Sequence, residues 1–272
     1  MNMILEMMSY PFLVRAVIGG VLVSLCASLL GVSLVLKRYS MIGDGLSHVS
    51  FGALSVALAA GWSPLKFSIP VVIIAAFFLL RITENGKLKS DAAIAIISAS
   101  ALAFGIVVTS LTTGMTTDVS SYMFGSILAM SSEDVRMTVI VSVIVLGMFF
   151  FCYNKVFAVT FDESFAKATG VSVSLYNVLI AVLTAVTIVL GMRMMGAMLI
   201  SSLIIFPALT SMRVFKSFQG VVWSSGILSV VCFCVGMVFS YGCSTPAGAS
   251  VVLVNLAAFL IFSGVQAVRK CL

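Results

Sequence analysis

Charged residues are scarce in this sequence: Asp, Glu, Lys and Arg make up 9% of its 272 residues, whereas 61% are hydrophobic. The mean hydropathy of the chain is +1.24. A soluble domain carries about 25% charged residues, so this composition excludes a soluble globular protein. No stretch is long and polar enough for a soluble catalytic domain, and the alternating segments of a membrane β-barrel, about ten residues each, are missing too.

Several motifs are also missing. The sequence has no Gly-x-x-x-x-Gly-Lys-Ser/Thr phosphate loop, so we do not expect it to bind ATP by that route. Its six cysteines show no Cys-x-x-Cys spacing and lie mostly in apolar runs, which indicates small buried side chains rather than disulfides or a zinc site. The net charge of +6 is scattered over short connections, so it does not predict nucleic-acid binding.

Apolar runs of about 18 residues or more recur along the whole chain, which is typical of an α-helical membrane protein. We predict an all-α polytopic fold in which residues 1–272 form one transmembrane domain of about eight to nine spans. The predicted spans are 12–36, 41–61, 66–82, 92–112, 137–153, 175–192, 195–212, 218–241 and 247–267. Residues 121–130 are too few to cross a bilayer about 30 Å thick, so a short outer-surface helix is expected there.

Basic residues predict the orientation of the chain, because they gather in cytoplasmic loops. Placing Lys37 and Arg38 in the cytoplasm puts eleven of the fifteen basic residues on that side. The eleven are Lys37, Arg38, Arg81, Lys87, Lys89, Lys155, Lys167, Arg213, Lys216, Arg269 and Lys270, against Arg15, Lys66, Arg136 and Arg193 outside. We therefore expect a multi-pass membrane protein with its N-terminus outside and its C-terminus in the cytoplasm.

The single histidine, His48, lies four residues after Asp44 in an apolar run. On a helix these two side chains share one face, one turn apart. A carboxylate and an imidazole so placed can share a divalent cation or a proton, and such groups are costly inside a membrane. Counted from Arg38 at about 1.5 Å per residue, His48 is expected near the bilayer midplane, where transporters hold their substrates.

Two interpretations of this pair stay open. The Asp44–His48 contact could serve only to fix the orientation of its helix. Alternatively, the pair contacts a metal ion in transit, with its remaining ligands supplied by oxygens, waters or the same residues of a second subunit, because the chain has no second histidine. So few ligands suit weak, transient coordination rather than a structural metal site.

The longest polar connection, residues 154–174, is predicted to be cytoplasmic and to contain a helix of about two to three turns. Thr160 and Glu163 have the spacing of a capping box, and the acidic Asp162 and Glu163 suit the positive end of a helix dipole. Gly170 is a natural stop.

Between these signals, Phe161, Phe165 and Ala168 fall on one face of the predicted helix and give it an apolar side. It is either an ordinary helix at the membrane surface or a helix that docks into a partner protein.

Five motifs in the same order and spacing resemble the membrane permease subunits of bacterial ABC importers for zinc, manganese and iron. They are KRYSMIGDGLSH at 37–48, YMFGS at 122–126, FDESFAKATGV at 161–171, GAMLISSLIIFPA at 196–208 and STPAG at 244–248. The resemblance covers nearly the whole chain.

The resemblance implies a homodimer of this chain in the lipid of the bacterial cytoplasmic membrane, two copies of a separate cytoplasmic ATPase subunit and an extracytoplasmic metal-binding protein. It implies that Asp44 and His48 contact the metal in the pathway. It also implies that the helix in 154–174 couples the chain to the ATPase. The coupling residues would be Phe161, Asp162, Glu163, Phe165, Lys167 and Gly170. No tightly bound cofactor and no nucleic acid is implied, since the divalent metal is the substrate.

The leading hypothesis is therefore a transporter subunit, not an enzyme, that moves a divalent metal ion, zinc first and then manganese or iron. The alternative is a stand-alone ion channel or a proton-coupled metal carrier that uses the Asp44–His48 pair as its ion site. An intramembrane enzyme is disfavoured, because no second histidine or paired acids supply a catalytic constellation.

Overall fold

The computed structural model describes residues 9–84, 90–112, 125 and 132–271, and every regular element in these ranges is an α-helix. The helices are α2 (Pro11–Leu36), α3 (Ile42–Ala59), α4 (Pro64–Glu84), α5 (Ser90–Leu111), α7 (Ser132–Phe151), α8 (Tyr153–Phe161), α9 (Glu163–Ala168), α10 (Val173–Met195), α11 (Ala197–Met212), α12 (Phe218–Cys243) and α13 (Ala247–Cys271). The predicted all-α fold is confirmed. The expected outer-surface helix at 121–130 falls outside the described residues, apart from Gly125.

Eight of the described helices are long and apolar enough to cross a membrane: α2, α3, α4, α5, α7, α10, α12 and α13. This agrees with the eight to nine spans predicted from sequence. The ninth predicted span, 195–212, corresponds to α11, which has only 16 residues. At about 1.5 Å per residue, α11 is about 24 Å long and thus shorter than the hydrocarbon core of a bilayer.

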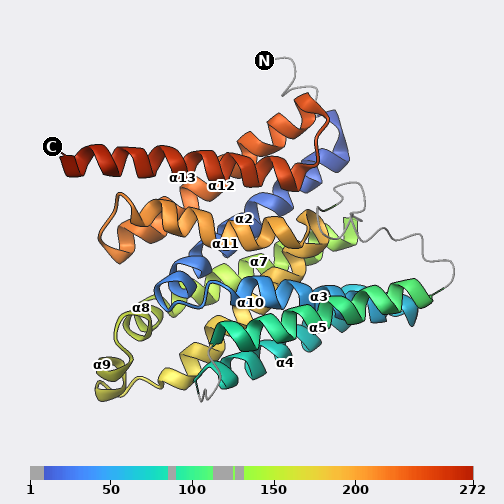
Figure 1. The fold of residues 1–272 in the computed structure, drawn as a ribbon, viewed down its shortest axis with the longest axis horizontal. Coiled ribbons are helices and arrows are strands. Elements are labelled where there is room, and N and C mark those ends of the chain that lie inside the picture. The colour runs from blue at the N-terminus through green and yellow to red at the C-terminus, as the bar shows by residue number, and fades with distance from the viewer. Residues whose placement is uncertain (1–8, 85–89, 113–124, 126–131, 272) are drawn as a thin grey trace.

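The helices form a bundle in which α2 and α10 lie at the centre (Figure 1). On one side α3 packs against both α4 and α5, and α4 also contacts α10. On the other side α2 contacts α11 and α12, and α13 covers these two. The short helices α8 and α9 lie at the same end of the bundle as the C-terminus, at the left of Figure 1. We call this end the α9 end.

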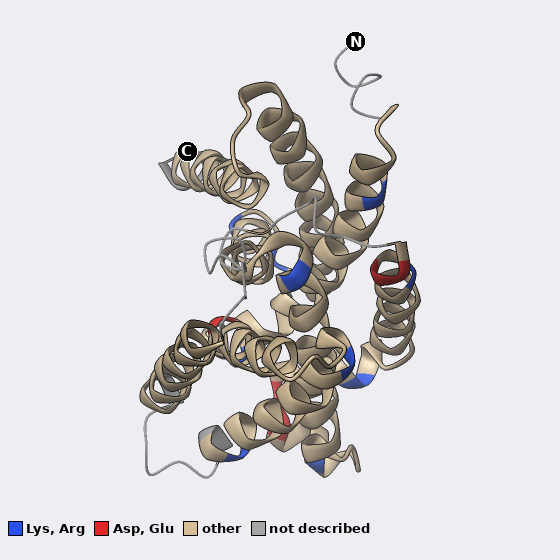
Figure 2. Ribbon diagram, turned by 90° about the vertical axis from the view of Figure 1, so that its right-hand side faces the viewer, with Lys and Arg blue, Asp and Glu red and all other residues tan. Residues whose placement is uncertain are grey.

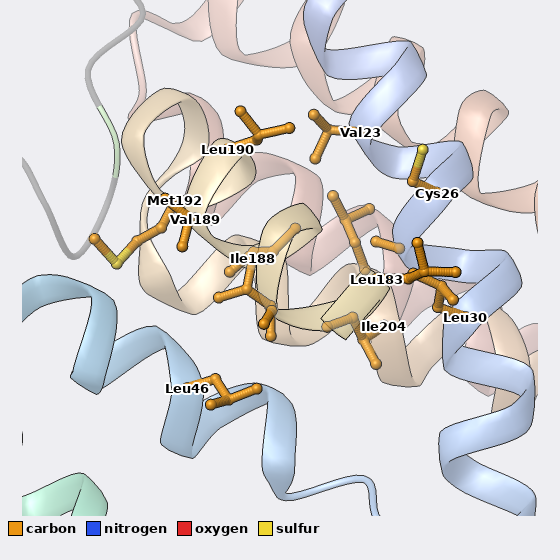
Figure 3. Close-up of a cluster of buried hydrophobic side chains, with 14 of the residues drawn as sticks. Val23, Cys26, Leu30, Leu46, Leu183, Ile188, Val189, Leu190, Met192 and Ile204 are labelled. Atoms are coloured by element: carbon orange, nitrogen blue, oxygen red, sulfur yellow. The ribbon is translucent and has the colours of Figure 1, made fainter. Parts of the chain in front are cut away.

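Part of the core is formed by aliphatic side chains of α2, α3, α10 and α11 (Figure 3). Leu30 of α2, Leu46 of α3, Ile188 of α10 and Ile204 of α11 are each at most 1% exposed. Small residues let the backbones of these helices approach closely, as expected where lipid removes the hydrophobic drive for helix association. At Gly31 of α2, for example, a Cβ atom would lie 2.0 Å from the backbone oxygen of Ile204.

Hydroxyl groups also link the central helices across this apolar interior. Ser225 and Ser229 of α12 donate hydrogen bonds to the backbone oxygens of Ser28 and Ser24 of α2, at 3.3 and 3.0 Å. Charged residues, by contrast, are few along the ribbon (Figure 2). A hydroxyl that finds a carbonyl partner avoids the cost of an unsatisfied polar group in the membrane, so these bonds fix α12 against α2.

The connection 154–174 differs from the sequence prediction, because it holds two helices instead of one. α8 follows α7 after a break at Cys152, and α9 follows α8 after a break at Asp162. The predicted capping box is wrong: Thr160 lies inside α8, where its hydroxyl bonds to the backbone oxygen of Val156 at 2.6 Å. This local bond removes Thr160 from the role of a cap.

Candidate functional site

Asp44 and His48 lie on one face of α3, as the sequence predicted. The Nε2 atom of His48 is 3.7 Å from the Oδ2 atom of Asp44. The side chain of His48 is 17% exposed and that of Asp44 is 45% exposed, whereas most of α3 is buried. The pair therefore forms an accessible polar strip on a helix that is otherwise mostly buried.

The pair lies nearer the α9 end of the bundle than the sequence count indicated. Arg38 adopts a left-handed backbone conformation with φ of 62°, so α3 begins only at Ile42. Asp44 is then in the first turn of α3, about 3 Å along the helix, and His48 is about 9 Å along it. Helix α3 is about 27 Å long, so His48 lies in its first half, short of the middle.

In this position the Asp44 carboxylate costs less free energy than it would at the middle of the membrane. α3 has no side-chain cap, and Asp44 is the acidic residue of its first turn. A carboxylate there interacts favourably with the unpaired N–H groups of the helix start. The same geometry would serve a purely structural pair, so both interpretations of Asp44 and His48 remain compatible with the α3 geometry.

One chain does not complete a metal site around this pair. Among the residues that the structure describes, no three or more His, Cys, Asp or Glu side chains come together in a way that could hold a metal ion. A structural zinc site needs four protein ligands. Asp44 and His48 can thus supply two ligands, and no other His, Cys, Asp or Glu of the described residues completes the set.

The second candidate region is α9. Asp162 is its N-cap, and its carboxylate accepts a hydrogen bond from the backbone N–H of Phe165 at 2.9 Å. At the other end Gly170 has φ of +82°, and the N–H of Val171 bonds to the backbone oxygen of Ala166 at 2.9 Å. This left-handed glycine ends the helix as the sequence predicted. The sequence signals thus located α9 but assigned its cap to the wrong residue.

Helix α9 turns its large apolar side chains outward. Phe165 is 61% exposed and Phe161, at the end of α8, is 57% exposed. Only Ala166 of α9 is buried, and Lys167 is exposed. Two exposed aromatic rings, one on the capped helix α9 and one at the end of α8, are suited to contact with another protein.

Glu163, by contrast, points back toward the bundle. Its Oε1 atom accepts a hydrogen bond from Nζ of Lys37 at 2.6 Å and another from the amide of Asn177 at 3.3 Å. Nζ of Lys37 also donates to the side-chain oxygen of Asn177. These three residues, which we call the polar triad, join the end of α2, the first turn of α9 and the first half of α10.

The charges of the polar triad affect the protonation of Glu163. Partial burial raises the pKa of Glu163, but the hydrogen bond and positive charge of Lys37 and the amide of Asn177 outweigh it, so the net pKa is lowered. The side chain of Lys37 is only 7% exposed, against 52% for Glu163. The sequence did not reveal this triad, because its members lie 126 and 14 residues apart and follow no periodic pattern.

The fold and these two regions define a polytopic membrane protein with a polar pair in one span and an exposed, capped helix at one end. The model of the ABC 3 transport family matches residues 9–266. The chain belongs to this family, and the resemblance to metal-importer permeases predicted from the sequence motifs is confirmed.

Named relatives agree with this membership. The chain is 27% identical to the high-affinity zinc uptake system membrane protein ZnuB of Haemophilus influenzae, with 93% of this chain and 97% of ZnuB covered. It is 28% identical to the manganese import system permease protein ScaB of Streptococcus gordonii, covering 93% of this chain and 90% of ScaB. The structure of PsaBC from Streptococcus pneumoniae in complex with Fab superposes with a TM-score of 0.86 at 29% identity, covering 96% of this chain and 94% of that chain.

Proposed function

We propose that this chain is the permease subunit of an ATP-driven importer, and that it moves a divalent metal ion past Asp44 and His48. The observation that carries the proposal is the accessible carboxylate–imidazole pair, whose groups lie 3.7 Å apart on one face of α3. Membership of the ABC 3 transport family supports import driven by a separate ATPase, and it disfavours a stand-alone channel or proton-coupled carrier.

Zinc is the proposed substrate, with manganese and iron next. Imidazole and carboxylate are both zinc ligands, and carboxylate oxygens also suit manganese. The names of the relatives include both zinc and manganese systems, which supports this choice of metals. Because one chain offers two ligands, we propose that a second copy of the chain or water completes the coordination.

The α9 end is proposed to face the cytoplasm, in keeping with the distribution of basic residues. There Phe161 and Phe165 would enter a groove of the ATPase subunit, and an extracytoplasmic metal-binding protein would deliver the ion at the opposite end. The exposure of Phe165 on the capped helix α9 and of Phe161 at the end of α8 supports this docking role.

Metal uptake by cells that lack their own importer tests the pathway pair. Asp44→Asn and His48→Gln replace the carboxylate and the imidazole by neutral amides, which are poor zinc ligands. Each is expected to lower zinc accumulation by about tenfold or more, since loss of even a group that supports a ligand costs about tenfold. Glu133→Gln, at an exposed acid in the first turn of α7, is the matched control and should keep normal uptake. Normal zinc, manganese and iron uptake by both pathway variants would refute the assignment.

Co-purification with the ATPase tests the docking helix. Phe165→Ala leaves the Asp162 cap intact and removes an exposed ring, so it should weaken recovery of the ATPase by about 10-fold, as truncation of an aromatic anchor does. Phe151→Ala is the control, because Phe151 is 89% exposed at the end of α7 but lies off α9. Equal recovery with both variants would argue against the docking role of α9.

A further inference from the structure

The polar triad of Lys37, Glu163 and Asn177 connects the two regions described above. Glu163 belongs to the first turn of α9, and Lys37 ends α2, immediately before the turn that leads into α3. That turn is held by backbone bonds from Tyr39 to Leu34 at 2.8 Å and from Ile42 to Tyr39 at 3.0 Å. Lys37 is therefore joined through a hydrogen-bonded turn to the start of α3, two residues before Asp44.

Lys37 has little freedom to exchange its partners for water. Its side chain is 7% exposed. The cavity beside it, of about 10 Å³, is lined mainly by apolar side chains. A space of this size holds one water at most. If α9 moved away with Glu163, the ammonium group would remain buried without its carboxylate, which is a costly state.

Glu163 faces a different environment on its other side. It lines a cleft of about 720 Å³ between α9 and the start of α10, together with Ser164, Lys167 and Asn177. The cleft leaves room beside α9, while Ala166 is the only buried residue of this helix. Helix α9 is thus loosely packed against the bundle but joined to α2 by an ion pair whose lysine is buried and whose carboxylate is half-exposed. This ion pair is its main polar connection to α2 among the described residues.

We propose that the polar triad transmits movement of α9 to the start of α3, and so couples ATP hydrolysis to metal passage at Asp44 and His48. Lys37, Glu163 and Asn177 are positioning residues in this scheme and contact neither ATP nor metal. The inference rests on the proposed function, because it assumes that α9 receives movement from an ATPase and that α3 carries the metal.

The test is the number of metal ions moved per ATP hydrolysed, measured in proteoliposomes that contain the whole complex, with zinc and manganese as parallel probes. Lys37→Gln and Glu163→Gln are expected to lower this ratio by about 2- to 30-fold, the range for residues that transmit coupling between sites. Both variants should still bind the ATPase, because Phe161 and Phe165 remain in place. Lys155→Gln, on the exposed side of α8, is the matched loss of a basic residue and should keep the wild-type ratio.

Exchanging the two charges, Lys37→Glu with Glu163→Lys, should raise the ratio above that of either single variant, because the ion pair is restored in reverse. Glu163→Asp is a milder change at a half-exposed position, and it serves if the Lys37 variant does not assemble. Its number of metal ions per ATP should lie between the values of the wild type and Glu163→Gln.

Three results would overturn the proposal: a wild-type ratio in Glu163→Gln and Glu163→Asp, an equal fall of transport and ATP hydrolysis, or no gain from the charge exchange. The second result would mean that the triad only holds α9 in place. Failure of the proposed function itself looks different, since the wild-type complex would then show no ATP-dependent zinc or manganese movement.

Discussion

Replacement of Gly31 by alanine tests whether α2 and α11 approach each other as closely as the structure shows. A Cβ atom at this position would lie 2.0 Å from the backbone oxygen of Ile204, whereas ordinary contacts begin at 3.4 Å. The two helices would have to separate by about 1.4 Å. Because the obstructing atom belongs to the backbone, no side-chain rotation can relieve the clash.

The expected loss of stability follows from two opposing terms. Overpacking costs about 1–3 kcal/mol, and a backbone clash belongs at the upper end of this range. Alanine recovers about 1 kcal/mol because it has the higher helix propensity. The net destabilisation of Gly31→Ala is thus about 2 kcal/mol, which corresponds to a fall in Tm of about 4–8 °C for a chain of this size.

The assay is the fraction of detergent-solubilised protein that stays monodisperse after heating, measured by fluorescence-detected size exclusion. Gly147→Ala in α7 is the matched control, since no atom lies within 4 Å of the position of its Cβ. This variant should have an unchanged or slightly higher Tm, because it gains helix propensity without a clash. The close packing of α2 against α11 would be refuted if Gly31→Ala melted at or above the temperature of Gly147→Ala.

Two further predictions concern ion pairs at opposite ends of the bundle. Arg193→Gln should lower stability by about 1–2 kcal/mol, because it removes the hydrogen bond that Arg193 donates to Asp134 at 2.8 Å. This value lies between those of surface and buried ion pairs, since both side chains are partly buried. A double-mutant cycle with Asp134→Asn, measured by the same heating assay, gives the coupling energy of the two residues. Glu163 has a lowered pKa, so its contribution to stability is present above the ordinary value of 4.5 and is lost as the pH falls through its folded-state pKa. The difference in Tm between wild type and Glu163→Gln should therefore shrink on acidification from pH 7 to below 4.5, and a constant difference would contradict the ion pair with Lys37.

The transmembrane helices could be predicted from sequence because each is an independent apolar run. The predicted start and end of α2, at 12 and 36, differ from Pro11–Leu36 by one residue at most. The predicted end of α10, at 192, was missed by three residues, because the helix continues to Met195 and breaks at Gly196, which has φ of 86°. Glycine is compatible with both a helix and a turn, so the sequence did not reveal where the helix ends.

The candidate site was predicted only as far as local spacing allows. The spacing of Asp44 and His48 placed them on one face of a helix, but their depth depends on the left-handed turn at Arg38, an unusual conformation for a residue with a Cβ. The capping signals of α9 were ambiguous, since both Thr160 and Asp162 are suitable N-caps. The pairing of Lys37 with Glu163 depends on the packing of α2 against α8 and α10, which no local pattern specifies.

In the proposed importer, an incomplete ligand set at Asp44 and His48 would suit a transport pathway. A complete set of four ligands would hold zinc tightly, and the ion would leave slowly. With two ligands per chain, the affinity of the pathway would depend on how closely the α3 helices of two copies approach each other. Movement of α9, passed through Lys37 to the start of α3, would change that approach. In the proposed importer, approach of the two α3 helices would favour binding of the ion and their separation would favour its release. No other metal site would then be needed in the described part of the chain.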